Sequence, residues 1–146
     1  MRELYQELII DHGKRPRNFR KIDDPTHCQT GHNPLCGDRL DLFIQCQHDV
    51  LDDVAFQGEG CAICMASASL MSQALKGQSK AHALNLFEAF YTALMGDDES
   101  QDVGALGKLE ALLGVSQYPT RVKCATLAWH TMKAALEQAS TTVSTE

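Results

Sequence analysis

The chain has 146 residues, of which 44% are hydrophobic and 22% are charged, and its formal net charge is −6 at pH 7. This length and composition are typical of one globular domain, and the negative charge argues against a nucleic-acid-binding protein, which normally carries a basic face. The N-terminus begins an amphipathic pattern in place of a signal peptide, and no apolar run reaches the roughly 18 residues of a membrane span. We therefore expect a cytoplasmic protein that binds neither nucleic acid nor membrane, with cysteines used as metal ligands or reactive thiols.

The first half of the chain predicts one helix and three strands. Apolar residues at helical spacing predict a helix over residues 2–12, and the Pro- and Asn-containing residues 13–25 predict a loop. Alternating apolar and polar residues predict a half-buried strand over residues 39–47, followed by a turn and a second strand near residues 51–57. A further short strand is expected around residues 26–31.

The second half of the chain predicts helices. Four are expected, over residues 62–75, 80–95, 105–113 and 119–138. The first of these presents one apolar stripe, while Ser79 suits an N-cap, Gly114 a C-cap and Pro119 the first helical turn. Strands followed by helices predict an α+β fold, a small antiparallel sheet of about three strands flanked by helices. Residues 1–138 are expected to form one domain, and residues 139–146 a polar, disordered tail.

Basic residues gather in the first predicted loop. They are Lys14, Arg15, Arg17, Arg20 and Lys21. Such a run is more often a solvated loop than a functional surface, and a docking patch for an acidic partner is the alternative.

Three cysteines lie at the predicted ends of structural elements. Cys36 lies in a turn made by proline and glycine, and Asp38 follows two residues later, so that both side chains can point the same way in extended backbone. Cys61 opens a helix, where the helix dipole favours a thiolate, and Cys124 lies in the first turns of the last helix. Three thiolates and one carboxylate make up the four ligands of a tetrahedral zinc site, although spacing alone does not bring them together.

The remaining cysteines and the histidines give weaker signals. Cys28 and Cys46 are expected to be surface thiols or small hydrophobic residues. Cys64 completes a C-x-x-C sequence with Cys61, which is compatible with a redox dithiol or with half a zinc ribbon. A redox dithiol would be expected in a thioredoxin-like context, and a zinc ribbon would need a second C-x-x-C sequence. Both are missing, so a core-facing thiol is the favoured interpretation. The histidines show no metal-binding spacing and are predicted to be surface residues. They are His12, His27, His32, His48, His82 and His130.

Four sequence motifs stand in order along the chain. They are residues 4–18 (LYQELIIDHGKRPRN), 33–38 (NPLCGD), 58–69 (GEGCAICMASAS) and 121–129 (RVKCATLAW). Together they resemble the NifU/IscU-like family of iron–sulfur cluster assembly proteins, and the likeness extends from Leu4 to about Leu136. IscU-type scaffolds carry a histidine directly before the third cysteine, whereas this chain has Lys123 there and a longer segment over residues 96–118. Both features resemble the SufU branch of the family, from which Cys64 departs because a serine is common at that position.

The resemblance implies a fold, a metal site and an activity. The implied fold is α+β, and the implied zinc ligands are Cys36, Asp38, Cys61 and Cys124. The implied activity is that of a zinc-dependent sulfurtransferase, which accepts persulfide sulfur from a SufS-type cysteine desulfurase and passes it to iron–sulfur cluster assembly scaffold proteins. We expect Cys36 to be the sulfur acceptor, because a Gly/Pro turn moves more easily than a helix start.

Two other functions use the same residues. An iron–sulfur scaffold of the IscU type would hold a transient cluster on the three cysteines, and thiolates suit such clusters well; Lys123, which offers no imidazole, argues for sulfur transfer. A non-catalytic adaptor, stabilised by zinc, would instead need Cys36 and Asp38 for folding.

Overall fold

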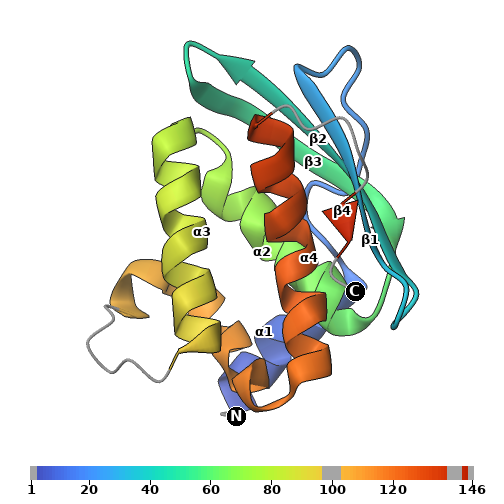
Figure 1. Cartoon of the computed structure of the whole chain (residues 1–146), viewed down its shortest axis with the longest axis vertical. Helices are drawn as coiled ribbons and strands as arrows, with labels where there is room; N and C mark the ends of the chain where they lie inside the picture. The colour runs from blue at the N-terminus through green and yellow to red at the C-terminus, as the bar shows by residue number, and fades with distance from the viewer. Residues whose placement is uncertain (1–2, 97–102, 138–142, 145–146) are drawn as a thin grey trace.

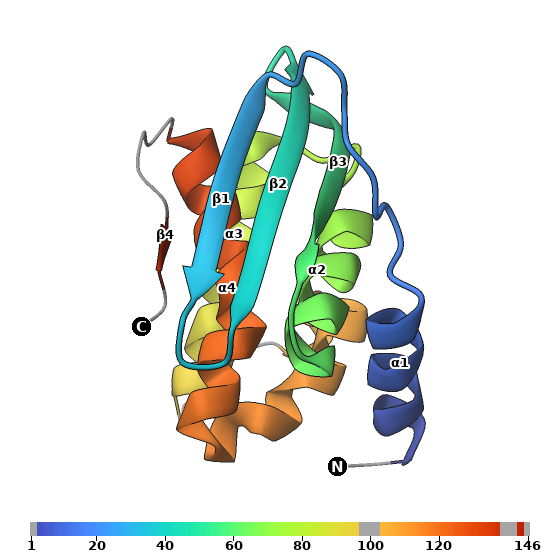
Figure 2. The ribbon, with the colours of Figure 1, turned by 90° about the vertical axis from the view of Figure 1, so that its right-hand side faces the viewer.

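The computed structural model describes residues 3–96, 103–137 and 143–144, and one sheet organises them (Figure 1). The strands β1 (His27–Asn33), β2 (Asp38–Gln47) and β3 (Val50–Glu59) pair antiparallel in the order β3-β2-β1, and the two-residue β4 (Val143–Ser144) lies parallel beside β1. The sheet forms one layer with the helices behind it (Figure 2). The predicted α+β fold is confirmed, with β1 two residues longer at its end than expected. Of the tail predicted over residues 139–146, all but Val143–Ser144 lies outside the described residues.

The helices begin and end close to their predicted bounds. They are α1 (Glu3–Lys14), α2 (Ala62–Leu75), α3 (Lys80–Met95) and α4 (Pro119–Leu136). Ser79 is the N-cap of α3, where its side chain accepts a hydrogen bond from the His82 backbone, and Pro119 opens α4 as expected. Among the described residues, no helix combines the length and the apolar character that a membrane span requires.

One predicted helix is wrong in type and in extent. Residues 105–113 belong to a 3₁₀ helix, η1 (Val103–Gln117), which has a kink at Gly107 and continues past Gly114. Of the buried side chains that the structure describes in η1, all but Ala111 recur at every third residue. They are Leu106, Leu109, Leu112 and Val115. A period of three matches the 3₁₀ helix, whereas the sequence prediction assumed the 3.6-residue period of an α-helix.

The helix α2 is buried nearly all round, which contradicts the single apolar stripe that was predicted for it. Residues 64–72 are all buried, since α2 packs against α1, α4 and the sheet. Ser67 ties α2 to α4: its hydroxyl donates to the Ala125 carbonyl at 2.5 Å and accepts from Trp129 Nε1 at 3.1 Å. This buried link fixes the start of one helix against the other, and both starts carry a cysteine of the predicted site.

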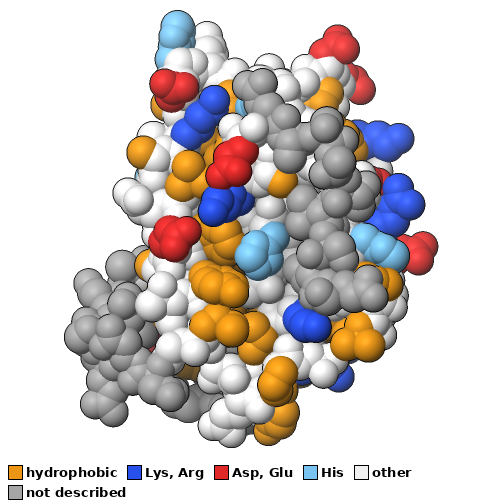
Figure 3. Space-filling model, viewed as in Figure 1, with side chains coloured by type: hydrophobic (Ala, Val, Ile, Leu, Met, Phe, Trp, Pro, Cys, Tyr) orange, Lys and Arg blue, Asp and Glu red, His pale blue; other side chains and the backbone are white. Residues whose placement is uncertain are grey.

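The arginines of the predicted loop are bound to carboxylates of the chain itself. Arg17 pairs with Asp11 of α1 at 2.6 Å, and Arg20 pairs with Asp53 of β3 at 2.6 Å. The pairing lowers the pKa of both carboxyl groups, chiefly through the hydrogen bonds from the arginines. The loop between α1 and β1 is therefore held against the body of the protein, and part of its positive charge is already compensated. On the opposite side, the face of α3 and α4 mixes hydrophobic side chains with charges of both signs (Figure 3).

Two of the six histidines contradict the prediction of surface positions. His12 is 1% exposed and its Nδ1 lies 2.7 Å from the Ser69 hydroxyl, while His27 is 9% exposed on the inner face of β1. Burial lowers the pKa of both side chains. Both are therefore held as neutral rings inside the fold, a role that carries no spacing signal in the sequence.

Gly31 lets β1 lie directly on α4. A Cβ at this position would lie 2.0 Å from Thr131 Oγ1 and 3.2 Å from Leu127 Cδ1. We expect Gly31→Ala to lower the free energy of unfolding by about 1–3 kcal/mol, the usual cost of overpacking a core. Chemical denaturation measures this loss. The double variant Gly31→Ala/Thr131→Ala should recover part of it, and equal losses in both variants would contradict the assigned contact.

Candidate metal centre

The predicted site residues meet at one end of the sheet. Asn33 and Asp38 are paired across β1 and β2, so residues 34–37 form a four-residue hairpin loop that carries Cys36. The chain leaves β3 at Glu59 and enters α2, whose N-cap is Cys61. The first turns of α4 bring Cys124 to the same place.

Three of the four predicted ligands lie together. The ligand atoms of Cys36, Asp38 and Cys124 are all within 4.8 Å of one another, and the two sulfur atoms are 3.5 Å apart. Asp38 and Cys124 are fully buried, whereas Cys36 is half-buried. The strand register, the length of the hairpin loop and the docking of α4 therefore bring Cys36 and Cys124 together, although 88 positions separate them in the sequence.

Cys61 lies beside this group with its sulfur turned to its own helix. Its Sγ accepts a hydrogen bond from the Cys64 backbone N–H at 3.4 Å, which caps α2. Its backbone N–H donates to Asp38 Oδ1 at 2.9 Å, and its side chain is close enough to Cys124 to raise the pKa of that thiol. Cys61 is thus adjacent to the cluster of three without sharing its tight spacing.

The electrostatics of the cluster fit a divalent cation. Burial raises the pKa of the Cys124 thiol, and the neighbouring Asp38, Cys36 and Cys61 raise it further. Such a group keeps its proton unless positive charge is brought close, since like charges in a dry site disfavour ionisation. Soft thiolates with one carboxylate suit zinc among the common metal ions, and metal binding would replace the thiol protons.

Cys64 lies behind the site as a core residue. It is 0% exposed, and burial raises the pKa of its thiol. The prediction of a core-facing thiol is confirmed. Of the other two cysteines, Cys28 is exposed and Cys46 half-buried, in agreement with their predicted positions.

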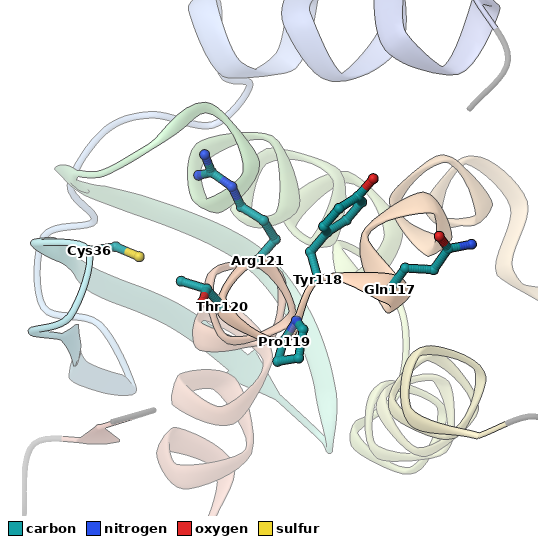
Figure 4. A pocket seen from close by; sticks show the side chains of 6 residues that line it. All are labelled: Cys36, Gln117, Tyr118, Pro119, Thr120 and Arg121. Atoms are coloured by element: carbon teal, nitrogen blue, oxygen red, sulfur yellow. The ribbon is translucent and has the colours of Figure 1, made fainter.

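A pocket of about 450 Å³ opens beside Cys36. Its other lining residues are Gln117, Tyr118, Pro119, Thr120 and Arg121, from the end of η1 and the start of α4. Figure 4 shows the Cys36 sulfur pointing toward the side chains of Thr120 and Arg121. Tyr118 is 59% exposed at this pocket, and Leu35, next to Cys36 in the hairpin loop, is 64% exposed. Cys36 is therefore the thiol of the cluster that faces a space large enough for part of another molecule.

Two residues that shape the site carried little sequence signal. Asn33 is fully buried against Asp38 and Cys124, and Gly60 leaves room for the Asp38 carboxylate. Both stand inside the sequence motifs, but the residue type alone did not separate them from ordinary turn residues. The contribution of residues 117–120 to the pocket also required the fold, because they meet Cys36 only after α4 docks on the sheet.

The sequence matches the NifU-like N-terminal domain family over residues 4–141. It is 42% identical over 130 residues to the zinc-dependent sulfurtransferase SufU of Bacillus subtilis, covering 89% of this chain and 87% of that protein. It is 38% identical over 140 residues to the iron–sulfur cluster assembly scaffold protein IscU of Streptococcus pyogenes, covering 96% of this chain and 87% of that protein.

A solved structure has the same architecture. FiSufU of Fervidobacterium islandicum, described as an iron–sulfur cluster assembly scaffold protein for the SUF system, superposes with a TM-score of 0.84 at 34% identity, covering 89% of this chain and 94% of that chain. The motifs, the fold and the cysteine-lined site agree with this likeness along nearly the whole chain. The chain therefore belongs to the NifU-like N-terminal domain family of iron–sulfur cluster assembly proteins.

Proposed function

We propose that this protein is a zinc-dependent sulfurtransferase that accepts persulfide sulfur from a SufS-type cysteine desulfurase in the cytoplasm. The sulfur then passes to scaffold proteins of iron–sulfur cluster assembly. The similarity to a relative named as a zinc-dependent sulfurtransferase supports this proposal. The observation that carries it is the unequal restraint of the three clustered ligands.

Asp38 and Cys124 are held in place, and Cys36 is not held in the same way. Asp38 accepts from the Cys61 backbone at 2.9 Å and from Asn33 Nδ2 at 3.4 Å. Cys124 is fully buried in the helix α4. Cys36 sits on a hairpin loop, half-buried, at the edge of the pocket. A reactive thiol needs access to its partner, and Cys36 combines that access with a place in the ligand cluster.

The transfer step assigned to Cys36 is a thiol exchange. Its thiolate attacks the terminal sulfur of the persulfide carried by the desulfurase cysteine, R–S–SH. A bond forms between Cys36 Sγ and that sulfur as the donor S–S bond breaks, and the electron pair leaves on the donor thiolate. The product is a Cys36 persulfide, with no net change in oxidation, and a second exchange of the same kind delivers the sulfur onward.

The metal ligands in this proposal are Cys36, Asp38, Cys61 and Cys124. Zinc bound there would keep the thiols deprotonated at neutral pH and stabilise the buried cluster of negative groups. Arg121, which is exposed at the pocket, adds positive charge close to Cys36. Lys123 is half-buried directly before Cys124 and offers no imidazole to the site, which favours sulfur transfer over cluster assembly.

The IscU-type scaffold function is the competing proposal, because relatives of that name are 38% and 36% identical to this chain. One experiment separates the two. Alanine production from cysteine by a SufS-type desulfurase is measured with and without the zinc-loaded protein. Strong stimulation, with zinc retained, is the result expected for a sulfur acceptor. Absence of stimulation, together with a stable cluster built on the protein from iron and sulfide, would establish the scaffold function instead.

A further inference from the structure

We propose that Asn33 is a positioning residue, whose side-chain amide holds Asp38 and Cys124 in place as metal ligands and leaves Cys36 free to exchange. This inference rests on the zinc site of the proposed function and goes beyond it, since Asn33 is not itself a ligand of that site. Its contacts with the two ligands provide the geometric basis.

Asn33 is the last residue of β1 and is 0% exposed. Its Nδ2 lies 3.4 Å from Asp38 Oδ2 and 3.7 Å from Cys124 Sγ. Both distances are at the long end of the hydrogen-bonding range, and the amide nitrogen carries one N–H for each of the two acceptors. One amide group therefore bridges the sheet, which carries Asp38, and the helix α4, which carries Cys124.

The orientation of the amide follows from charge. An amide nitrogen is a donor only, whereas the carboxylate of Asp38 is an acceptor only. The reverse orientation would direct the amide oxygen at that carboxylate and at the sulfur, and would be repulsive. The nitrogen must therefore face the ligands.

The other end of the amide argues against a purely structural role. Asn33 Oδ1 is buried and has no hydrogen-bond partner among the residues that the structure describes. A buried oxygen without a partner destabilises a fold, and an apolar residue would avoid that cost. The feature that favours asparagine here is the donor contact with Asp38 and Cys124.

The same contacts distinguish the ligands from one another. Asn33 donates to Asp38 and to Cys124, and these two residues are also the fully buried members of the cluster. Cys36 lies three residues after Asn33, at the edge of the pocket. Groups that hydrogen-bond to metal ligands fix their orientation and are worth about 10–100-fold in metal affinity. Asn33 thus restrains Asp38 and Cys124, which should remain bound to the metal, whereas Cys36, the proposed sulfur acceptor, can move.

The test compares Asn33→Ala and Asn33→Val with the wild-type protein. Zinc release into a chromogenic chelator is expected to be about 10–100-fold faster in both variants. Both zinc-free variants should retain a cooperative melting transition, so that zinc release is compared between folded proteins. In the cobalt-substituted protein, the thiolate-to-cobalt charge-transfer band should move to lower energy, since the sulfur loses a donor. Gln29→Ala, a buried amide on the same face of β1, is the matched control and should release zinc at the wild-type rate.

Two outcomes would overturn the proposal. One is zinc release within about twofold of wild type, with an unchanged cobalt spectrum, in a folded variant. The other is failure of both Asn33 variants to fold while Gln29→Ala folds, which would assign Asn33 to the fold. Desulfurase stimulation is measured separately on the wild-type protein. Its absence would reject the sulfurtransferase function but leave the zinc-release comparison valid.

Discussion

Replacing Cys36 with alanine is expected to reduce alanine production by the desulfurase to the level seen without this protein. The thiol proposed to receive the sulfur is absent from this variant, and no other cysteine of the cluster faces the pocket within the described part of the chain. The fold should survive, because Cys36 lies in a hairpin loop and is half-buried, so that its loss opens no large cavity in the core. Alanine production and the melting temperature of the zinc-free variant measure the two effects.

The control for this prediction is Cys28→Ala, which removes an exposed thiol from β1 outside the site. It should stimulate the desulfurase as well as wild type does. If Cys36→Ala stimulates normally, Cys36 is not the acceptor. If the variant loses zinc and unfolds under conditions in which the zinc-loaded wild-type protein stays folded, the result would instead support the zinc-stabilised adaptor, whose cysteines serve only the fold.

Gly60→Ala is expected to weaken zinc binding by about 10-fold or more, although residue 60 is not a ligand. A Cβ at this position would lie 2.8 Å from Asp38 Oδ1 and 3.2 Å from Cys64 Sγ. Asp38 is fully buried and accepts a hydrogen bond from the neighbouring Cys61 backbone, so its carboxylate cannot move away without losing that bond. The methyl group therefore displaces the ligand. Competition with a zinc chelator measures the change in affinity.

A double-mutant cycle isolates the cause of this effect. In an Asp38→Ala background the added methyl group meets no carboxylate, so Gly60→Ala should change the melting temperature of the zinc-free protein much less than it does alone. Equal changes in both backgrounds would attribute the effect to the backbone or to Cys64, and would leave Asp38 uninvolved.

The parts of the fold that follow a regular sequence period could be predicted. Apolar and polar residues alternate in β2, and apolar residues recur at 3.6-residue spacing in α3 and α4. Each pattern reflects which face of the element is buried, so it can be recognised in the sequence. The type of η1 was predicted wrongly because most of its buried residues recur every three positions, a spacing that is hard to separate in a sequence from the 3.6-residue period of an α-helix. The buried surface of α2 was underestimated because its small residues pack closely on all sides of the helix. The serines among them are buried, although their polarity predicts exposure.

The sequence identified side chains that can bind a metal, but it did not define how all of them are arranged in space. Thiol and carboxylate side chains can be identified one by one in the sequence, but only the fold shows that Cys36, Asp38 and Cys124 lie close together. The turn of the Cys61 sulfur into its helix cap depends on a backbone conformation that the sequence does not specify. The pocket depends on how α4 docks against the hairpin loop, and the position of Asn33 depends on strand register. Such features require contacts between residues that are remote along the chain.

The hairpin loop that carries Cys36 limits how far its sulfur can be carried. The loop is anchored at Asn33 and Asp38, which face each other across β1 and β2. Two residues of extended chain span about 7 Å, so the Cα atom of Cys36 cannot move further than this from that of Asp38. Under the proposed function, the protein therefore could not act as a swinging arm that collects sulfur at one enzyme and delivers it at a distance. Both the donor and the receiving thiol would have to be inserted at the pocket, one after the other, so that delivery would depend on the exchange of whole partners.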